Sequence, residues 1–89
     1  YGGEEFIIYF ANTGIDDAAV VLDKLREGVS RLQILTDKNE LTQVTISMGV
    51  TEFPTYDMSV QGLIEKADQA MYYSKENGRN RVTKYSDIM

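Results

Sequence analysis

The first residues whose types could do chemistry are Gly2-Gly3-Glu4-Glu5, directly before an apolar run. Two glycines allow positive φ angles and a tight hairpin, and they leave the backbone open to a ligand. Because neighbouring side chains of an extended segment point in opposite directions, Glu4 and Glu5 can reach different places, one of them a cleft. Taken alone, such a tetrapeptide is most often an ordinary charged turn at a sheet edge.

Four of the nine basic residues fall close together near the other end of the chain: Lys75, Arg79, Arg81 and Lys84. Lys75 lies in the last turn of a predicted helix, where a cation also complements the negative helix end. Arg79 follows just beyond, so the two side chains can converge on one anion, Arg as a planar fork and Lys as a point charge. The alternative is a solvated helix end followed by an edge strand with charged rims.

Composition limits the chemistry of the chain. Its 89 residues suffice for one small domain, and the net charge of −5 argues against general nucleic-acid binding, which depends on basic surface. Cysteine and histidine are both absent, so a metal held by side chains needs carboxylates, which favours Mg²⁺, Mn²⁺ or Ca²⁺. No apolar run approaches the roughly 18 residues of a membrane span, and no signal peptide is visible. We therefore expect a cytoplasmic segment without membrane contact, although its parent protein could be membrane-anchored.

The first half of the chain predicts a strand and a helix. Phe6-Ile7-Ile8-Tyr9-Phe10-Ala11 is a continuous apolar run, typical of a strand covered on both faces. Asn12-Thr13-Gly14 is a turn, after which Asp16 or Asp17 can cap a helix. We expect that helix over residues 17–32. Its apolar stripe, at spacings of three and four, consists of Ala18, Val21, Leu22, Leu25, Val29 and Leu32.

The second half predicts a loop, two strands and one more helix. Residues 37–40 are polar and indicate a loop, and residues 44–51 alternate with the period of a strand. Gly49 in that strand permits a close approach to its backbone. Ser59 can cap the second helix, and Gly78 suits the left-handed position after its end. Its inner stripe is Val60, Leu63, Ile64, Ala67, Ala70, Met71 and Ser74. Residues 81–85 predict a last strand, and the order β-α-β-α-β favours helices packed on one sheet.

Three blocks of the sequence resemble one known family in order and spacing. Tyr1-Gly2-Gly3-Glu4-Glu5-Phe6 resembles the signature hairpin of GGDEF (diguanylate cyclase) domains, and Thr45-Ile46-Ser47-Met48-Gly49-Val50 is similar to the strand that follows it. Ala67-Asp68, Met71-Tyr72, Lys75 and Gly78-Arg79-Asn80-Arg81-Val82 are similar to the family's last helix and strand. The resemblance extends from residue 1 to about residue 85.

This resemblance implies an α/β (α+β) domain related to polymerase palms and nucleotide cyclases, with helices on a mostly antiparallel sheet. Active family members are diguanylate cyclases. They condense two GTP into cyclic di-GMP with release of two pyrophosphates. Two GGDEF domains meet face to face as a homodimer, each holding one GTP. Residues 1–85 would then be the C-terminal half of such a domain, and residues 86–89 a tail.

The same resemblance assigns roles at the matching positions. Gly2 and Gly3 would form the loop against which the nucleotide lies. Glu4 and Glu5 would be the catalytic residues. Glu4 would ligate Mg²⁺ or Mn²⁺, and Glu5 would support the metal and substrate site. Lys75 and Arg79 would hold the GTP phosphates.

The family's upstream half, with a further metal-ligating Asp and the guanine contacts, has no counterpart in these 89 residues. We therefore expect no cyclisation by the chain alone, and association through its exposed sheet edge. Two alternatives stay open: a non-catalytic GGDEF module for GTP binding, regulation or dimerisation, and a small α/β interaction domain without a nucleotide site.

Overall fold

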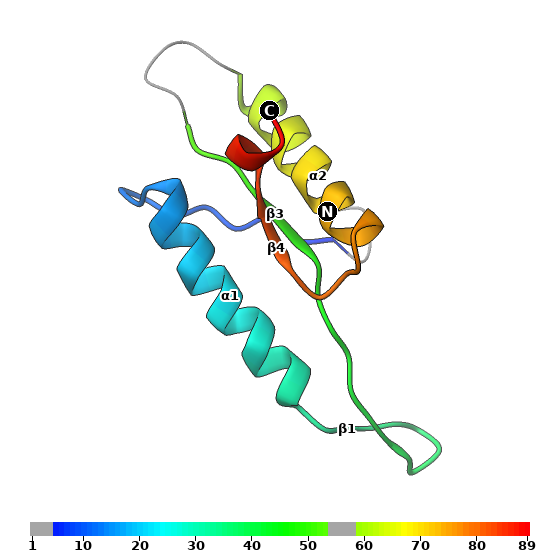
Figure 1. Cartoon of the computed structure of the whole chain (residues 1–89). Helices are drawn as coiled ribbons and strands as arrows, with labels where there is room; N and C mark the ends of the chain where they lie inside the picture. Colours follow the sequence, from blue (N-terminus) through cyan, green and yellow to red (C-terminus); the bar gives the residue numbers. More distant parts are fainter. Residues whose placement is uncertain (1–4, 54–58) are drawn as a thin grey trace.

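The computed structural model describes residues 5–53 and 59–89. In chain order it contains helix α1 (Ile15–Arg31), strands β1 (Ile34–Leu35), β2 (Leu41–Thr42) and β3 (Met48–Val50), helix α2 (Val60–Glu76), strand β4 (Val82–Lys84) and the 3₁₀ helix η1 (Tyr85–Asp87). Figure 1 shows β3 and β4 between the two long helices, with the β1–β2 hairpin extending away from them. The mixed α+β class expected from the sequence is confirmed.

The centre of the fold is the β3–β4 pair, which is parallel with Met48 opposite Val82. A mostly antiparallel sheet was expected, but α2 connects β3 to β4 as a crossover helix, and that connection joins parallel strands. Within the described ranges, antiparallel pairing is confined to β1 and β2. On one face of the central pair, Val50 forms a buried cluster with Ala18 and Leu22 of α1.

The opposite face of the same pair packs against α2. Side chains alternate along a strand, so Gly49 and Thr83 face away from α1. Ser74 of α2 is fully buried here, and its hydroxyl donates to the Met48 carbonyl at 2.7 Å. The hydroxyls of Ser74 and Thr83 also form a hydrogen bond of 2.6 Å. Among the described residues, every buried side-chain nitrogen or oxygen has a hydrogen-bond partner. The result is three layers, α1, the strand pair and α2.

Gly49 lies where the backbone of α2 packs directly against β3. A Cβ built at this position would overlap the Met71 amide nitrogen and the Ala67 carbonyl oxygen, and would lie 2.7 Å from the Ala70 carbonyl carbon. The expected close backbone approach at Gly49 is therefore confirmed, and the approaching group is the α2 backbone.

The strand expected over residues 6–11 is absent. The segment is not part of either sheet, and Phe6 and Tyr9 are 87% and 83% exposed. A strand exists only through hydrogen bonds to a neighbour, and none of the described segments pairs with this one. Only Phe10 packs against the buried cluster. The expectation of a strand covered on both faces is therefore wrong for this structure, and the observed order begins with α1.

Helix α1 begins two residues earlier than expected and ends one residue earlier. Its N-cap is Gly14, which offers no side-chain cap, so the expected Asp16 or Asp17 cap is wrong. Both aspartates lie within the first turn, where their charge complements the positive helix end. The free Ile15 amide donates instead to the Glu52 carboxylate at 3.3 Å. A residue beyond β3 thus does the capping.

The polar loop over residues 37–40 is confirmed, but the two short strands beside it were not expected. β1 and β2 pair antiparallel, Ile34 with Thr42 and Leu35 with Leu41. Strands of two residues are too short to show a period of two in the sequence. In the described part of the chain, no helix is long and apolar enough to cross a membrane.

Candidate functional site

The C-terminal end of α2 brings Lys75 and Arg79 to one end of the central pair. Asn77 is the C-cap of α2, and Gly78 has a positive φ of 111°. The expectation that Gly78 takes the left-handed position after the helix end is therefore confirmed. The Arg79 amide donates to the Ser74 carbonyl at 2.9 Å, the bond that defines a Schellman cap. Because Ser74 is itself fixed to Met48 and Thr83, the end of α2 is anchored to both strands.

Glu5 meets Lys75 at this place. The Lys75 Nζ atom lies 3.9 Å from Glu5 Oε2, and the two side chains are 36% and 31% exposed. The residues are 70 positions apart in the sequence, so the fold brings one signature carboxylate to one predicted phosphate ligand. Gly2, Gly3 and Glu4 lie outside the described residues.

Arg79 has an unusual backbone and an exposed side chain. Its φ is 62° and that of Asn80 is 49°, so three consecutive residues with Gly78 have left-handed φ angles. A non-glycine residue in this conformation costs about 1–2 kcal/mol. Such conformations gather at functional sites, where the surroundings hold them in place.

The four basic residues of this region differ in what they contact. Lys75 pairs with Glu5, and the Arg81 guanidinium donates to the Asn77 carbonyl at 3.0 Å. Lys84 pairs with Asp16 of α1 at 3.0 Å, and this hydrogen bond and charge raise the pKa of Lys84. Within residues 5–53 and 59–89, no ion pair or side-chain hydrogen bond engages the Arg79 guanidinium. Arg79 is therefore the cation of this group best placed to receive an outside anion.

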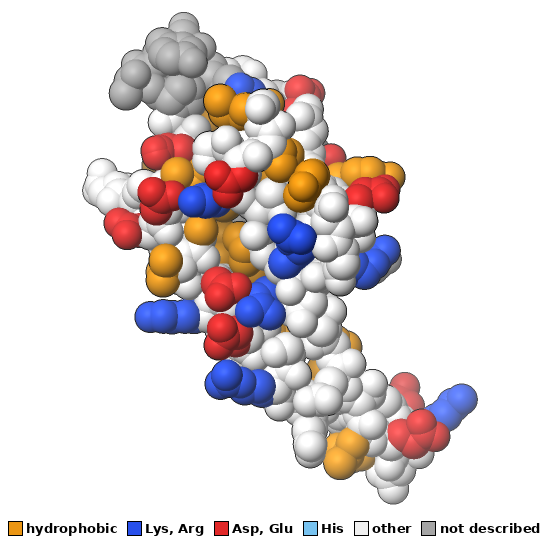
Figure 2. Space-filling model, in the orientation of Figure 1, with side chains coloured by type: hydrophobic (Ala, Val, Ile, Leu, Met, Phe, Trp, Pro, Cys, Tyr) orange, Lys and Arg blue, Asp and Glu red, His pale blue; other side chains and the backbone are white. Residues whose placement is uncertain are grey.

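The surface does not form one basic patch. Figure 2 shows Lys and Arg side chains separated by Asp and Glu over the face in view. A cation between carboxylates binds a small anion through a few directed bonds, whereas an extended polyanion needs a continuous basic surface.

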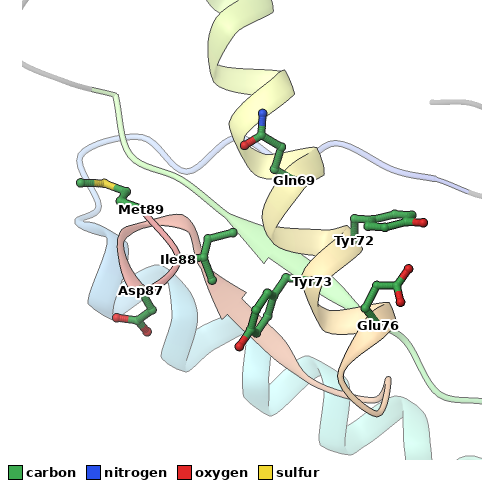
Figure 3. A pocket seen from close by; sticks show the side chains of 7 residues that line it. All are labelled: Gln69, Tyr72, Tyr73, Glu76, Asp87, Ile88 and Met89. Carbon is green, nitrogen blue, oxygen red and sulfur yellow. The ribbon is translucent and has the colours of Figure 1, made fainter.

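A hollow on the surface lies elsewhere, between α2 and the end of the chain. Its volume is about 460 Å³. Figure 3 shows its lining residues: Gln69, Tyr72, Tyr73, Glu76, Asp87, Ile88 and Met89. A hydrogen bond to Glu76 raises the pKa of the Tyr72 hydroxyl. Since Glu5, Lys75 and Arg79 do not line it, this hollow is separate from the predicted site.

A metal site does not arise from the described residues alone, because they contain no group of three or more acidic side chains placed to hold a cation. Glu5 nevertheless offers the hard oxygen donor that Mg²⁺ or Mn²⁺ prefers, and Glu4 beside it has the same chemistry. The donor type therefore fits a divalent hard cation, with further ligands required from outside these ranges.

A family comparison identifies the class of domain to which the chain belongs. A model of the family described as "Diguanylate cyclase, GGDEF domain" matches residues 1–81, and the chain belongs to this family. Diguanylate cyclase A of Treponema denticola is 44% identical over 84 residues, which are 93% of this chain and 22% of that protein. Response regulator PleD of Caulobacter vibrioides is 34% identical over 83 residues, 92% of this chain and 18% of that protein. The chain thus spans about a fifth of the length of these relatives.

A solved structure shows the same fold. The GGDEF domain of DgcB from Caulobacter crescentus, in complex with c-di-GMP, superimposes with a TM-score of 0.76 at 33% identity. The match covers 83% of this chain and 44% of that one. The resemblance inferred from three sequence blocks is confirmed, and this chain corresponds to less than half of a solved GGDEF domain.

Proposed function

We propose that this chain forms the C-terminal half of a diguanylate cyclase catalytic domain, which condenses two GTP into cyclic di-GMP and releases pyrophosphate. The observation that carries the proposal is the meeting of Glu5 with Lys75, one turn before the exposed Arg79. An acid and two cations at one end of a strand pair suit a nucleoside triphosphate, because the cations neutralise the charge of the phosphates. Gly2 and Gly3 are assigned to the loop against which the nucleotide lies.

The weakness of the Glu5–Lys75 pair supports a binding role. A pair this exposed contributes only about 0.2–1 kcal/mol to stability. Lys75 can therefore exchange Glu5 for a phosphate at little cost, and Glu5 keeps the ammonium group near its working position until GTP arrives. Lys75 supplies a mobile point charge, whereas Arg79 supplies a planar fork held by a fixed turn.

Divalent cations support such a reaction by neutralising charge that develops on the phosphoryl oxygens. We assign Glu4 as the carboxylate ligand of Mg²⁺ or Mn²⁺ and Glu5 as its supporting neighbour. With no histidine in the chain, a carboxylate is the side chain of this half suited to accept the proton of the 3′-hydroxyl. A second GGDEF domain, facing the first, would present its own GTP to that hydroxyl.

The test is product formation by a complete domain that contains this chain, supplied with GTP and Mg²⁺. Cyclic di-GMP is expected from the unchanged domain. Glu4→Ala should abolish it, because the proposed metal ligand is lost, while thermal stability stays nearly unchanged. Full activity of Glu4→Ala would exclude the proposed metal role.

Calorimetry with a non-hydrolysable GTP analogue separates the alternatives. Binding by the unchanged domain without product formation would favour a regulatory module. Absence of binding would favour an interaction domain without a nucleotide site.

A further inference from the structure

The turn that carries Arg79 is held by two hydrogen bonds from distant parts of the chain. The Asn80 amide donates to the Ser47 hydroxyl at 3.1 Å, and Arg26 Nη1 of α1 donates to Asn80 Oδ1 at 2.9 Å. Asn80 thus connects the end of α2 with the segment before β3 and with the opposite helix. Left-handed φ angles at Arg79 and Asn80 are unfavourable by themselves, so contacts of this kind must maintain them.

Arg26 is built into α1 in a way that leaves it little freedom. Its side chain is only 17% exposed, and Nε donates to Asp23 Oδ1 at 2.7 Å. Glu27 Oε1 lies 3.7 Å from Nη2, and the hydrogen bond to Asp23 raises the pKa of Arg26. The two carboxylates hold the edge of the planar guanidinium formed by Nε and Nη2, and the remaining nitrogen, Nη1, donates to Asn80. The guanidinium is therefore a rigid connection between helix and turn.

We infer that Arg26 is a positioning residue for the GTP phosphates: it holds Asn80, and through Asn80 the left-handed backbone from which Arg79 reaches the nucleotide. This inference rests on the proposed function. Arg26 itself is occupied by Asp23 and Asn80, so its effect passes through Arg79. A ligand group fixed before the substrate arrives loses less conformational entropy on binding.

The experiment uses the complete domain and compares Arg26→Ala with Arg31→Ala. Both residues lie on α1 and contact Glu27, but Arg31 is 79% exposed and its contacts do not include the turn. Calorimetry with a non-hydrolysable GTP analogue should show roughly tenfold weaker binding for Arg26→Ala, as expected for the loss of one hydrogen bond to a charged group. Arg31→Ala should bind as the unchanged domain does.

Two further variants separate positioning from general destabilisation. Asn80→Gly keeps the left-handed conformation accessible and removes the side-chain amide whose oxygen accepts from Arg26, so it should weaken binding like Arg26→Ala. The double variant Arg26→Ala with Asn80→Gly should be no weaker than either single one, because both break the same contact. In a domain that already carries Arg79→Ala, adding Arg26→Ala should not weaken binding of the GTP analogue any further.

Hydrogen exchange supplies a readout that does not need the nucleotide. The Arg79 and Asn80 amides should exchange faster in Arg26→Ala and keep their rate in Arg31→Ala. Unchanged exchange, or an undiminished loss of binding in the Arg79→Ala background, would overturn the inference. If the unchanged domain binds the analogue and Arg26→Ala binds equally well, the inference fails and the proposed function stands. Failure of the unchanged domain to bind would overturn both.

Discussion

Arg79 shows at the residue scale how the backbone prepares a side chain for a ligand. Its left-handed φ of 62° is energetically unfavourable, yet its amide is fixed to Ser74 while its guanidinium is exposed. A structural role would engage the guanidinium, as the neighbouring Arg81 engages the Asn77 carbonyl. We therefore expect the strain at Arg79 to serve binding at the expense of stability.

Arg79→Ala should weaken binding of the GTP analogue by roughly tenfold or more, since a charge-assisted phosphate contact is lost. Arg79→Gly should weaken binding equally, but its domain should be more stable than that of Arg79→Ala by about 1 kcal/mol, because glycine tolerates a positive φ. Calorimetry and urea unfolding measure the two effects. Binding by Arg79→Ala at the unchanged affinity would refute the assignment of Arg79.

The residue scale also shows what sequence reasoning could and could not find. Lys75 and Arg79 stood out because a helix stop and a known motif surround them. Arg26 did not, since its contact with Asn80 joins residues 54 positions apart and leaves no local signal. Only the packing of α1 against the strand pair, which brings Arg26 to the turn after α2, reveals it.

At the scale of elements, regular periods were predicted well and pairing was not. Both helices and β4 follow from apolar spacing, and the Ser59 cap accepts from the Gly62 amide at 3.0 Å. The strand predicted over residues 44–51 is observed only as β3, so residues 44–47 were wrongly predicted as strand. The run over residues 6–11 has the composition of a strand, but strand formation depends on a partner that composition does not reveal. Part of the α1 stripe is also uncovered, since Val21 and Leu25 are 50% and 46% exposed. Two strands are too narrow to cover the whole stripe.

Gly49 gives the sharpest prediction at this scale. Gly49→Ala should lower the free energy of unfolding by roughly 1–3 kcal/mol or more, because the new methyl group meets helix backbone that cannot rotate away. Gly28→Ala in α1 is the matched control. Its Cβ would meet nothing within 4 Å, so it should stabilise the domain by about 0.5–1 kcal/mol through helix propensity. Urea unfolding of both variants in the complete domain tests the sign. Equal stabilities for Gly49→Ala and the unchanged domain would contradict the packing described.

At the scale of the whole molecule, the described residues would supply one wall of the proposed nucleotide site. They contain the anchored turn, the two cations and one signature carboxylate, but only a thin core with four buried apolar side chains: Ala18, Leu22, Val50 and Ala70. Phe6, Ile7, Ile8 and Tyr9 are all more than half exposed. The match covers 44% of the DgcB chain, so more than half of that chain has no counterpart in the match.

The most direct test compares GTP turnover by the complete domain with turnover by the 89-residue chain alone, both with Mg²⁺. We predict cyclic di-GMP from the complete domain and none from the chain, because we expect the other half to supply further metal and guanine contacts. Product from the chain alone, or no product from a complete domain that binds GTP, would contradict it.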